Sequence, residues 1–163
     1  MSRPSRLVLL GHPVAHSLSP RFQNAALRAA GIALRYDAQD VAPDALSAAL
    51  DALRSANAAG NVTIPHKEAV FAQCDRVTAL AARVGAVNTF WTEGDALVGH
   101  NTDVGGFAAA VADAFGPPGA WQVVVVGAGG SAAAVLAAIE RWPGARVTVV
   151  SRSRDRAAGL VAR

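Results

Sequence analysis

Three observations predict an α/β fold for this 163-residue chain. Short apolar stretches typical of strands alternate with longer stretches typical of helices, which is the pattern of consecutive βαβ units. The segment Gly116-Pro117-Pro118-Gly119 is the clearest break in this pattern. After it, an apolar strand, a glycine-rich turn and a helix follow one another directly, as in a parallel sheet covered by helices.

The elements before this break follow from local signals. Ser19-Pro20 is typical of a helix start, with serine as the N-cap and proline at the first helical position. Leu46, Leu50 and Leu53 lie on one face of a further helix. Glu93-Gly94-Asp95 separates two strands as a hairpin turn. We expect strands at residues 6–10, 32–37, 60–64, 86–92 and 96–100, and helices at 21–30, 43–54, 66–72, 77–84 and 102–115.

The elements after the break form a second βα pattern. The continuous apolar run at 121–126 predicts a parallel strand buried on both faces. A glycine-rich turn follows at 127–130, and a helix is expected at 131–141. Residues 146–150 predict a second buried strand, and 155–162 begin another helix.

The composition excludes several classes of protein. Apolar residues make up 52% of the chain and charged residues 17%, which suits a globular protein and not a disordered one. No run of about 18 strongly apolar residues is present, so no transmembrane helix is expected. The apolar run at 7–11 is too short for a signal peptide. The net charge is only +3, and no basic cluster precedes the C-terminus, so a nucleic-acid partner is not favoured.

Three residue types narrow the chemistry. The single cysteine, Cys74, excludes an internal disulfide and a four-cysteine zinc site, and it favours the reducing cytoplasm. His12 and His16 are four residues apart, but they lie on a loop without a clear acidic partner, so we expect no metal site. Lys67 is the only lysine among the 15 basic residues.

The turn after the apolar strand fits a dinucleotide-binding pattern. Gly127, Gly129 and Ala132 match G-x-G-x-x-G/A between a strand and a helix. The first glycine permits the tight turn, the second lets the backbone approach a pyrophosphate, and the free N–H groups of the helix start meet the anion. The predicted contact residues of the turn are Gly127, Ala128, Gly129, Gly130 and Ser131. The alternative is a plain glycine-rich turn between a strand and a helix.

The end of the second strand favours NADP over NAD. An NAD site usually places an acidic residue there, to hold the ribose 2′-hydroxyl. Here the tip contains Ser151, Arg152 and Ser153 and no acid. Arginine suits a 2′-phosphate because it forms charge-assisted and often bidentate hydrogen bonds. A solvated arginine loop is the alternative interpretation.

A set of polar residues lies where the strands of the first part end. Hydroxyl, amide and charged groups of this kind bind carboxylates and polyols when rigid elements hold them. Each has a structural alternative: Ser19 as a helix cap, the asparagines as turn residues, Asp103 as a favourable charge at a helix start, and Lys67 as a solvated cation. The set comprises Ser17, Ser19, Asn61, Thr63, Lys67, Asn88, Asn101 and Asp103.

Taken together, these segments resemble the shikimate dehydrogenase family. The motifs that carry the resemblance occur in the family's order from residue 7 to the end of the chain. They are Ser17-Leu18-Ser19-Pro20, Asn61-Val62-Thr63-Ile64-Pro65-His66-Lys67, Gly85-Ala86-Val87-Asn88-Thr89, Gly99-His100-Asn101-Thr102-Asp103 with Gly105-Gly106-Phe107, and Gly127-Ala128-Gly129-Gly130.

The resemblance implies a fold and a reaction. It implies an α/β substrate-binding domain with a mostly parallel sheet over residues 1–103, followed by a partial Rossmann-type NADP-binding domain over 104–163. The implied reaction is the reversible, NADP-dependent reduction of 3-dehydroshikimate to shikimate in aromatic amino-acid biosynthesis. Family members are longer, so the resemblance also implies that the C-terminal part of the cofactor domain is missing here and that this chain alone is weakly active or inactive.

The resemblance also implies roles for the site residues. Ser17 and Ser19 would hold the substrate carboxylate, while Asn61, Thr63, Asn88 and Asp103 would hold ring hydroxyls. Lys67 and Asp103 would be the catalytic pair. The glycine turn would meet the pyrophosphate, and Arg152, flanked by Ser151 and Ser153, would meet the 2′-phosphate.

The implied chemistry gives the single lysine a physical reason. While the cofactor supplies the hydride, Lys67 can exchange a proton with the reacting oxygen and stabilise charge that develops there. Arginine could not replace it, because its guanidinium stays protonated.

Three alternatives remain open from the sequence. They are a quinate/shikimate dehydrogenase that uses NAD, a catalytically inactive fragment that binds shikimate, and a Rossmann oxidoreductase with another substrate. The sequence does not give the oligomeric state, and a homodimer stays open.

Overall fold

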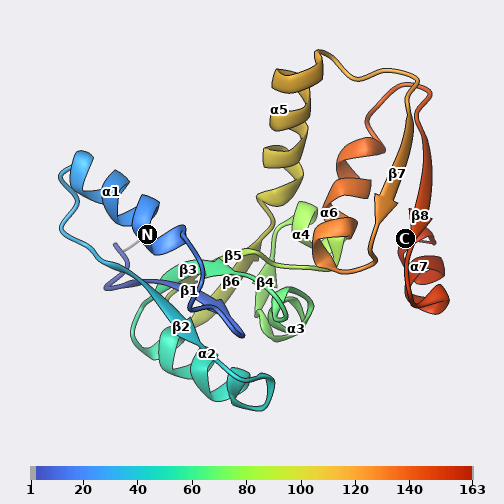
Figure 1. The fold of residues 1–163 in the computed structure, drawn as a ribbon. Coiled ribbons are helices and arrows are strands. Elements are labelled where there is room, and N and C mark those ends of the chain that lie inside the picture. Colours follow the sequence, from blue (N-terminus) through green and yellow to red (C-terminus); the bar gives the residue numbers. More distant parts are fainter. Residues whose placement is uncertain (1–2, 163) are drawn as a thin grey trace.

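The computed structural model describes residues 3–162, which form two separate β-sheets with helices packed around them (Figure 1). The first sheet has six strands in the order β2-β1-β3-β5-β6-β4, and the second pairs β7 with β8. The strands are β1 Leu7–Gly11, β2 Tyr36–Asp40, β3 Ala59–Val62, β4 Arg76–Val77, β5 Thr89–Glu93, β6 Ala96–His100, β7 Gln122–Val126 and β8 Arg146–Val150.

Helices connect the strands, so the predicted α/β class is confirmed. They are α1 Ser19–Ala29, the short 3-10 helix η1 Pro43–Ala45, α2 Leu46–Ser55, α3 Lys67–Gln73, α4 Ala79–Val84, α5 Asp103–Phe115, α6 Gly130–Ile139 and α7 Arg154–Val161. In the first sheet, β1 runs parallel to β2 and β3, and β4 runs parallel to β6. Only the pairings of β5 with β3 and β6 are antiparallel, so this sheet is mostly parallel, as expected.

The core of the first sheet confirms the helix face predicted for α2. Leu46, Leu50 and Leu53 are each only 2% exposed. They belong to a buried cluster that also contains Val8 and Phe90. Burying each of these side chains stabilises the folded state by roughly 1.5–3 kcal/mol, because it removes apolar surface from water.

Helix α5 leads from the first sheet to the second, and α6 packs against it (Figure 1). Small side chains make this close contact: Ala133, Ala134 and Ala137 of α6 share a buried cluster with Val84 and Val104. The short Ala side chains let helix backbones approach, which holds the second sheet close to the first.

Four local expectations were wrong. Strand β2 begins at Tyr36 and not at residue 32, and the two-residue strand β4 was missed. Ser19 is not the N-cap of α1, because Leu18 occupies that position without a side-chain cap bond. The Ser19 backbone N–H instead donates to Ser17 Oγ over 3.2 Å.

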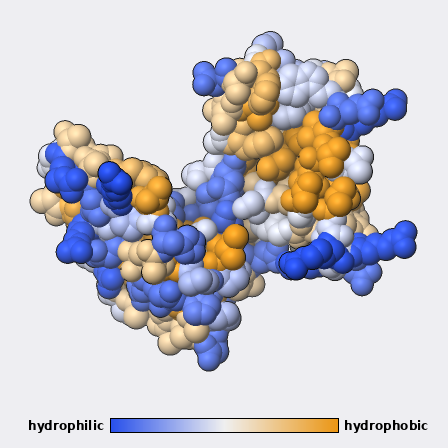
Figure 2. All heavy atoms as spheres, viewed as in Figure 1, coloured by the Kyte–Doolittle hydropathy of each residue, from blue (hydrophilic) through white to orange (hydrophobic). Residues whose placement is uncertain are grey.

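The fourth wrong expectation concerns the second sheet, which is not buried on both faces. Val124 is 65% exposed and Val126 is 83% exposed, because α6 covers the opposite face of the sheet and no described element covers theirs. Figure 2 shows hydrophobic surface gathered on the half of the molecule that carries β7 and β8. The residue pattern of a buried parallel strand is present, but the described chain buries only one of its faces.

Within residues 3–162, every helix is too short or too polar to cross a membrane.

Candidate active site

An ion pair joins the starts of two helices at the centre of the candidate site. Lys67 is the first residue of α3, and Asp103 is the first residue of α5. Lys67 Nζ lies 2.7 Å from Asp103 Oδ2, although the two residues are 36 positions apart in sequence. Their side chains are 14% and 32% exposed, so the pair is partly shielded from water while an edge stays open to a ligand.

Asn88 holds the other oxygen of the Asp103 carboxylate. Asn88 is buried, and its Nδ2 donates to Asp103 Oδ1 over 2.7 Å and to Thr102 Oγ1 over 2.9 Å. Its Oδ1 accepts from the Thr102 backbone N–H over 2.8 Å. These bonds fix the orientation of the Asn88 amide, because its nitrogen can only donate and its oxygen can only accept. Both carboxylate oxygens of Asp103 are therefore held in place.

Asn101 anchors the backbone segment that carries Asp103. This side chain is fully buried, and its Oδ1 accepts from the backbone N–H of Asp103 over 3.0 Å. Its Nδ2 donates to the Ala86 carbonyl over 2.9 Å. A buried amide satisfied at both ends locks the backbone that carries Asp103.

Asn61 enters the same network from β3. Its Nδ2 donates to Thr89 Oγ1 over 3.1 Å, and Thr89 Oγ1 in turn donates to Asn88 Oδ1 over 3.0 Å. Asn61 Oδ1 accepts a hydrogen bond from the Tyr36 hydroxyl over 2.8 Å. Burial raises the pKa of Tyr36 to about 12, so this phenol stays protonated and donates at neutral pH. Lys67, Asp103, Asn88 and Asn61 thus form one connected network.

Among the described residues, the side chains of Ser17, Ser19 and Thr63 form no hydrogen bond with this network. β1 and β3 are neighbouring parallel strands, so the loop after Gly11 and the residue Thr63 leave the sheet at the same edge. A Cβ atom added at Gly11 would lie 2.6 Å from Thr63 Cγ2, which shows how closely the two segments approach. The Ser17 backbone N–H donates to the Val14 carbonyl, so the serine loop is held by its own turn.

The glycine turn and the arginine tip line one cavity. This cavity, of about 700 Å³, is bounded by the turn from Gly127 to Gly129, by Ser151, Arg152 and Ser153, and by Arg156. Gly127 has φ +119°, a conformation that favours glycine. Ser151 Oγ accepts from Ser153 N, and Ser153 Oγ accepts from Arg156 N at the start of α7. The two serines therefore shape the tip, and the exposed arginines supply its charge.

A second cavity joins this turn to Lys67. It has a volume of about 370 Å³ and is lined by Lys67 and Glu68 on one side and by Gly127, Ser131 and Arg156 on the other. Since Gly127, Gly129 and Arg156 line both cavities, the two spaces adjoin. The expected catalytic residue Lys67 and the expected nucleotide-binding residues therefore border adjacent spaces.

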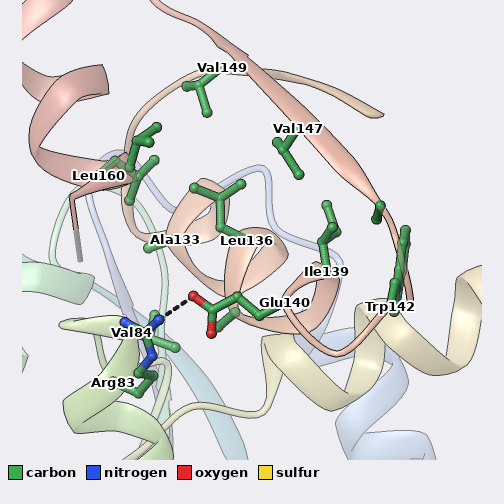
Figure 3. Close-up of a pocket in the computed structure, with 13 residues that line it drawn as sticks. Arg83, Val84, Ala133, Leu136, Ile139, Glu140, Trp142, Val147, Val149 and Leu160 are labelled. Carbon is green, nitrogen blue, oxygen red and sulfur yellow. Dashed lines mark hydrogen bonds and ion pairs between the residues drawn. The ribbon is translucent and has the colours of Figure 1, made fainter. Parts of the chain in front are cut away.

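A third cavity, of about 270 Å³, lies between α6, β8 and α7 (Figure 3). Leu136, Ile139, Val147 and Val149 make its lining apolar, and an ion pair between Arg83 and Glu140 lies at its edge. None of the expected site residues lines it, so we do not assign it to the active site. Among residues 3–162, no three His, Cys, Asp or Glu side chains gather in a way that could hold a metal ion.

Comparison with known proteins identifies the family. The shikimate dehydrogenase substrate binding domain matches residues 9–90, which is half of the chain. The chain belongs to the shikimate dehydrogenase family. This confirms the resemblance carried by the sequence motifs.

Two curated relatives are both named shikimate dehydrogenase (NADP(+)). The protein of Symbiobacterium thermophilum is 45% identical over 161 residues, which is 98% of this chain and 55% of the relative. The protein of Geobacter metallireducens is 46% identical over 157 residues, which is 95% of this chain and 55% of the relative. This chain therefore spans about half the length of the shikimate dehydrogenases it matches.

Solved shikimate dehydrogenases share the fold. The Thermus thermophilus enzyme in complex with NADP(H) and shikimate superposes with a TM-score of 0.85 at 41% identity, over 96% of this chain and 59% of that chain. The Aquifex aeolicus enzyme gives a TM-score of 0.89 at 33% identity, over 99% of this chain and 61% of that chain.

Sequence reasoning missed several residues that support the site. Tyr36, Thr89 and Thr102 bond directly to Asn61 or Asn88, and Arg156 lines both cavities. Thr89 and Thr102, which flank the hairpin strands, were a weak signal. Tyr36 carried none, although it lies within the strand expected at residues 32–37. Arg156 lies four residues beyond Arg152, the arginine that the sequence indicated.

Proposed function

We propose that this protein is an NADP-dependent shikimate dehydrogenase, which reversibly reduces 3-dehydroshikimate to shikimate in aromatic amino-acid biosynthesis. The observation that carries the proposal is the contact between Lys67 and Asp103, together with the cavity that extends from Lys67 to the glycine turn. The names of the relatives and the NADP(H)–shikimate complex of a similar protein support it. We further propose residues 1–103 as the substrate-binding domain and 104–163 as the partial NADP-binding domain.

The residues of the nucleotide cavity fit NADP. The turn offers backbone N–H groups at the start of α6 for a pyrophosphate. Arg152 and Arg156 give the tip the positive charge that a 2′-phosphate requires, and no acidic side chain lines this cavity. When bound, NADPH supplies the hydride that reduces the ring carbonyl.

Lys67 is proposed as the proton donor and acceptor of the reaction. In the reduction, hydride adds to the carbonyl carbon, the C=O π electrons move to oxygen, and the Lys67 ammonium donates one proton to that oxygen. Asp103 orients the ammonium through its ion pair. In the reverse direction, the neutral Lys67 amine takes the hydroxyl proton back as hydride leaves the ring carbon. Asn88 keeps Asp103 in position, since it holds the carboxylate oxygen that Lys67 does not.

The remaining residues are proposed to bind the rest of the substrate. Ser17 and Ser19 would hold the carboxylate, at the start of α1. Thr63, Asn88 and Asn61 would hold ring hydroxyls. Asn61 Oδ1 retains a second lone pair beside the one that accepts from Tyr36, so it can accept from a substrate hydroxyl without breaking the network.

Turnover and affinity test the proposal together. NADPH formation from shikimate and NADP+ is measured alongside shikimate binding by calorimetry, in the wild type and in Lys67→Ala, Lys67→Arg and Arg28→Ala. Both Lys67 variants should lose turnover by orders of magnitude with little change in affinity, while the exposed Arg28 on α1 serves as a matched control. Near-normal turnover of Lys67→Ala would refute the assignment.

Two other outcomes identify the alternatives. Shikimate binding without turnover in the wild type would favour a shikimate-binding fragment. Faster turnover with NAD than with NADP, unaffected by Arg152→Ala, would favour a quinate/shikimate dehydrogenase that uses NAD.

We also infer a cytoplasmic location, a small-molecule substrate and no nucleic-acid partner. The single cysteine supports the location, and the net charge of only +3 supports the absence of a nucleic-acid partner. Sedimentation analysis at several concentrations would test whether the protein forms a homodimer.

A further inference from the structure

The Lys67 ammonium has a second partner that belongs to the nucleotide turn. Its Nζ donates to Ser131 Oγ over 3.0 Å, in addition to its bond with Asp103. Ser131 is the second residue of α6, directly after the glycines of the turn. The ammonium group therefore lies between a carboxylate of the first part of the chain and a hydroxyl of the second.

The stem of Lys67 packs against the same turn. A Cβ atom added at Gly130 would lie 3.2 Å from Lys67 Cβ and 3.1 Å from Ala86 Cβ, which is tighter than ordinary van der Waals contact. An added side chain would have to push these neighbours apart by a few tenths of an ångström, so glycine suits this close approach of α6 to the lysine. The first turn of α6 is thus in direct contact with the Lys67 side chain, both at its base and at its charged end.

A second bond joins α3 to the later part of the chain, this time to α7. Glu68, the neighbour of Lys67 in α3, accepts from Arg156 of α7 over 3.2 Å. The first two residues of α3 therefore both bond to the part of the chain that carries the nucleotide turn. A change at that turn can therefore affect Lys67 through a single group, the Ser131 hydroxyl.

We infer that Ser131 is a positioning residue for Lys67, whose hydroxyl relays nucleotide binding at the turn to the ammonium group. This inference rests on the proposed function of the same site. A serine hydroxyl can accept from Lys67 and still donate its own proton. That proton is then available to an anion at the start of α6, where backbone N–H groups also favour negative charge. Donation to an anion strengthens the same oxygen as an acceptor, so the Lys67–Ser131 bond tightens when the turn is occupied.

The single lysine of the chain makes the relay directly measurable. Because Lys67 is the only lysine, protein labelled with ¹³C-lysine gives one side-chain ε-methylene signal in NMR spectra. Its position and its mobility are recorded with and without NADP+ in the wild type, Ser131→Ala, Ser131→Thr and Ser47→Ala. Ser131→Thr keeps the hydroxyl, and Ser47 is an exposed serine of α2 that serves as a matched control.

The expected result is a loss of response in one variant only. NADP+ should shift and rigidify the Lys67 signal in the wild type, in Ser131→Thr and in Ser47→Ala. In Ser131→Ala at saturating NADP+, the shift should fall to roughly half or less, because the hydroxyl link is gone. An unchanged response in Ser131→Ala, with NADP+ bound as shown by calorimetry, would overturn the inference.

Shikimate separates this inference from the proposed function. Shikimate should shift the Lys67 signal in every variant, since it meets the ammonium directly. If it does not, the proposed substrate is wrong, while a Ser131-dependent response to NADP+ still supports the relay. If the wild type binds no NADP+, both the relay and the proposed cofactor are overturned.

Discussion

The Tyr36 hydroxyl donates to Asn61 Oδ1 over 2.8 Å and so connects two strands that flank β1. Asn24 of α1 holds the backbone of the same tyrosine, through Oδ1 to the Tyr36 N–H over 2.9 Å and through Nδ2 to the Tyr36 carbonyl over 2.8 Å. The orientation of Asn61 in the candidate site is therefore set from a helix and a strand that carry none of the proposed catalytic groups.

Tyr36→Phe should destabilise the protein and weaken shikimate binding. It leaves the Asn61 oxygen without its donor in a partly buried place, which costs about 1–2 kcal/mol in the free energy of unfolding. Asn61 is then held only through its Nδ2, so its oxygen is less well oriented and the affinity for shikimate should fall several-fold. Urea unfolding and calorimetry measure the two effects. An unchanged shikimate affinity would show that Asn61 does not depend on Tyr36.

Stability should fall at alkaline pH. Burial raises the pKa of Tyr36 to about 12 and the pKa of the Cys74 thiol to about 11. Both groups are held neutral in the fold, so their contribution is present below their ordinary pKa values and is lost as pH rises through the raised values. The free energy of unfolding should decline above about pH 9, where the unfolded thiol begins to ionise. Tyr36→Phe and Cys74→Ala should each flatten part of this decline, and tyrosinate absorbance follows Tyr36 because it is the only tyrosine.

Asp40 should stabilise the fold at neutral pH and lose this effect in acid. The hydrogen bond with His12, and then the bond from the Val14 backbone N–H, lower the pKa of the Asp40 carboxyl. A lowered carboxyl pKa contributes stability that is present above the usual value of about 4 and disappears as pH falls through the lowered one. The stability difference between the wild type and Asp40→Asn should therefore shrink below about pH 4. Asp44→Asn, at an exposed residue of η1, is the matched control, and a pH-independent difference for Asp40→Asn would contradict the prediction.

Glu68→Gln should strengthen binding of NADP+. Arg156 lines the nucleotide cavity and bonds to the Glu68 carboxylate, which competes with a phosphate for the same guanidinium. An exposed pair of this kind is worth at most about 1 kcal/mol, so the affinity should rise by up to about fivefold. Glu140→Gln changes the net charge equally at a residue paired with Arg83, outside the nucleotide cavity. Equal gains in both variants, measured by calorimetry at one salt concentration, would mean that only the overall charge matters.

Gly60→Ala should be severely destabilising. A Cβ atom at Gly60 would lie 2.0 Å from the Val8 carbonyl oxygen, which belongs to the backbone of the neighbouring strand β1. Because backbone cannot move aside as a flexible side chain can, the β1–β3 pairing must open, at a cost of roughly 3 kcal/mol or more. Gly105→Ala in α5 meets nothing within 4 Å and should instead stabilise by about 0.5–1 kcal/mol. Thermal unfolding of the two variants should shift in opposite directions.

Much of the fold could be predicted because its signals are local. The spacing of Leu46, Leu50 and Leu53 follows the helical period, and Gly94 lies at the tip of a two-stranded hairpin. Strand β8 occupies the range expected for it. The start of β2 was misplaced because residues 32–34 are apolar, although the paired strand begins only at Tyr36.

The sequence by itself determined the alternation of strands and helices, the glycine turn and the motif set that places the chain in its family, since turn chemistry and residue period act over a few neighbouring positions. Only the tertiary structure decided that Lys67 meets both Asp103 and Ser131, and that Tyr36 bonds to Asn61 across an intervening strand. These contacts depend on strand order and on how α5 and α6 cross. The same is true of the open face at Val124 and Val126, because burial depends on what covers a strand and not on the strand's own residues.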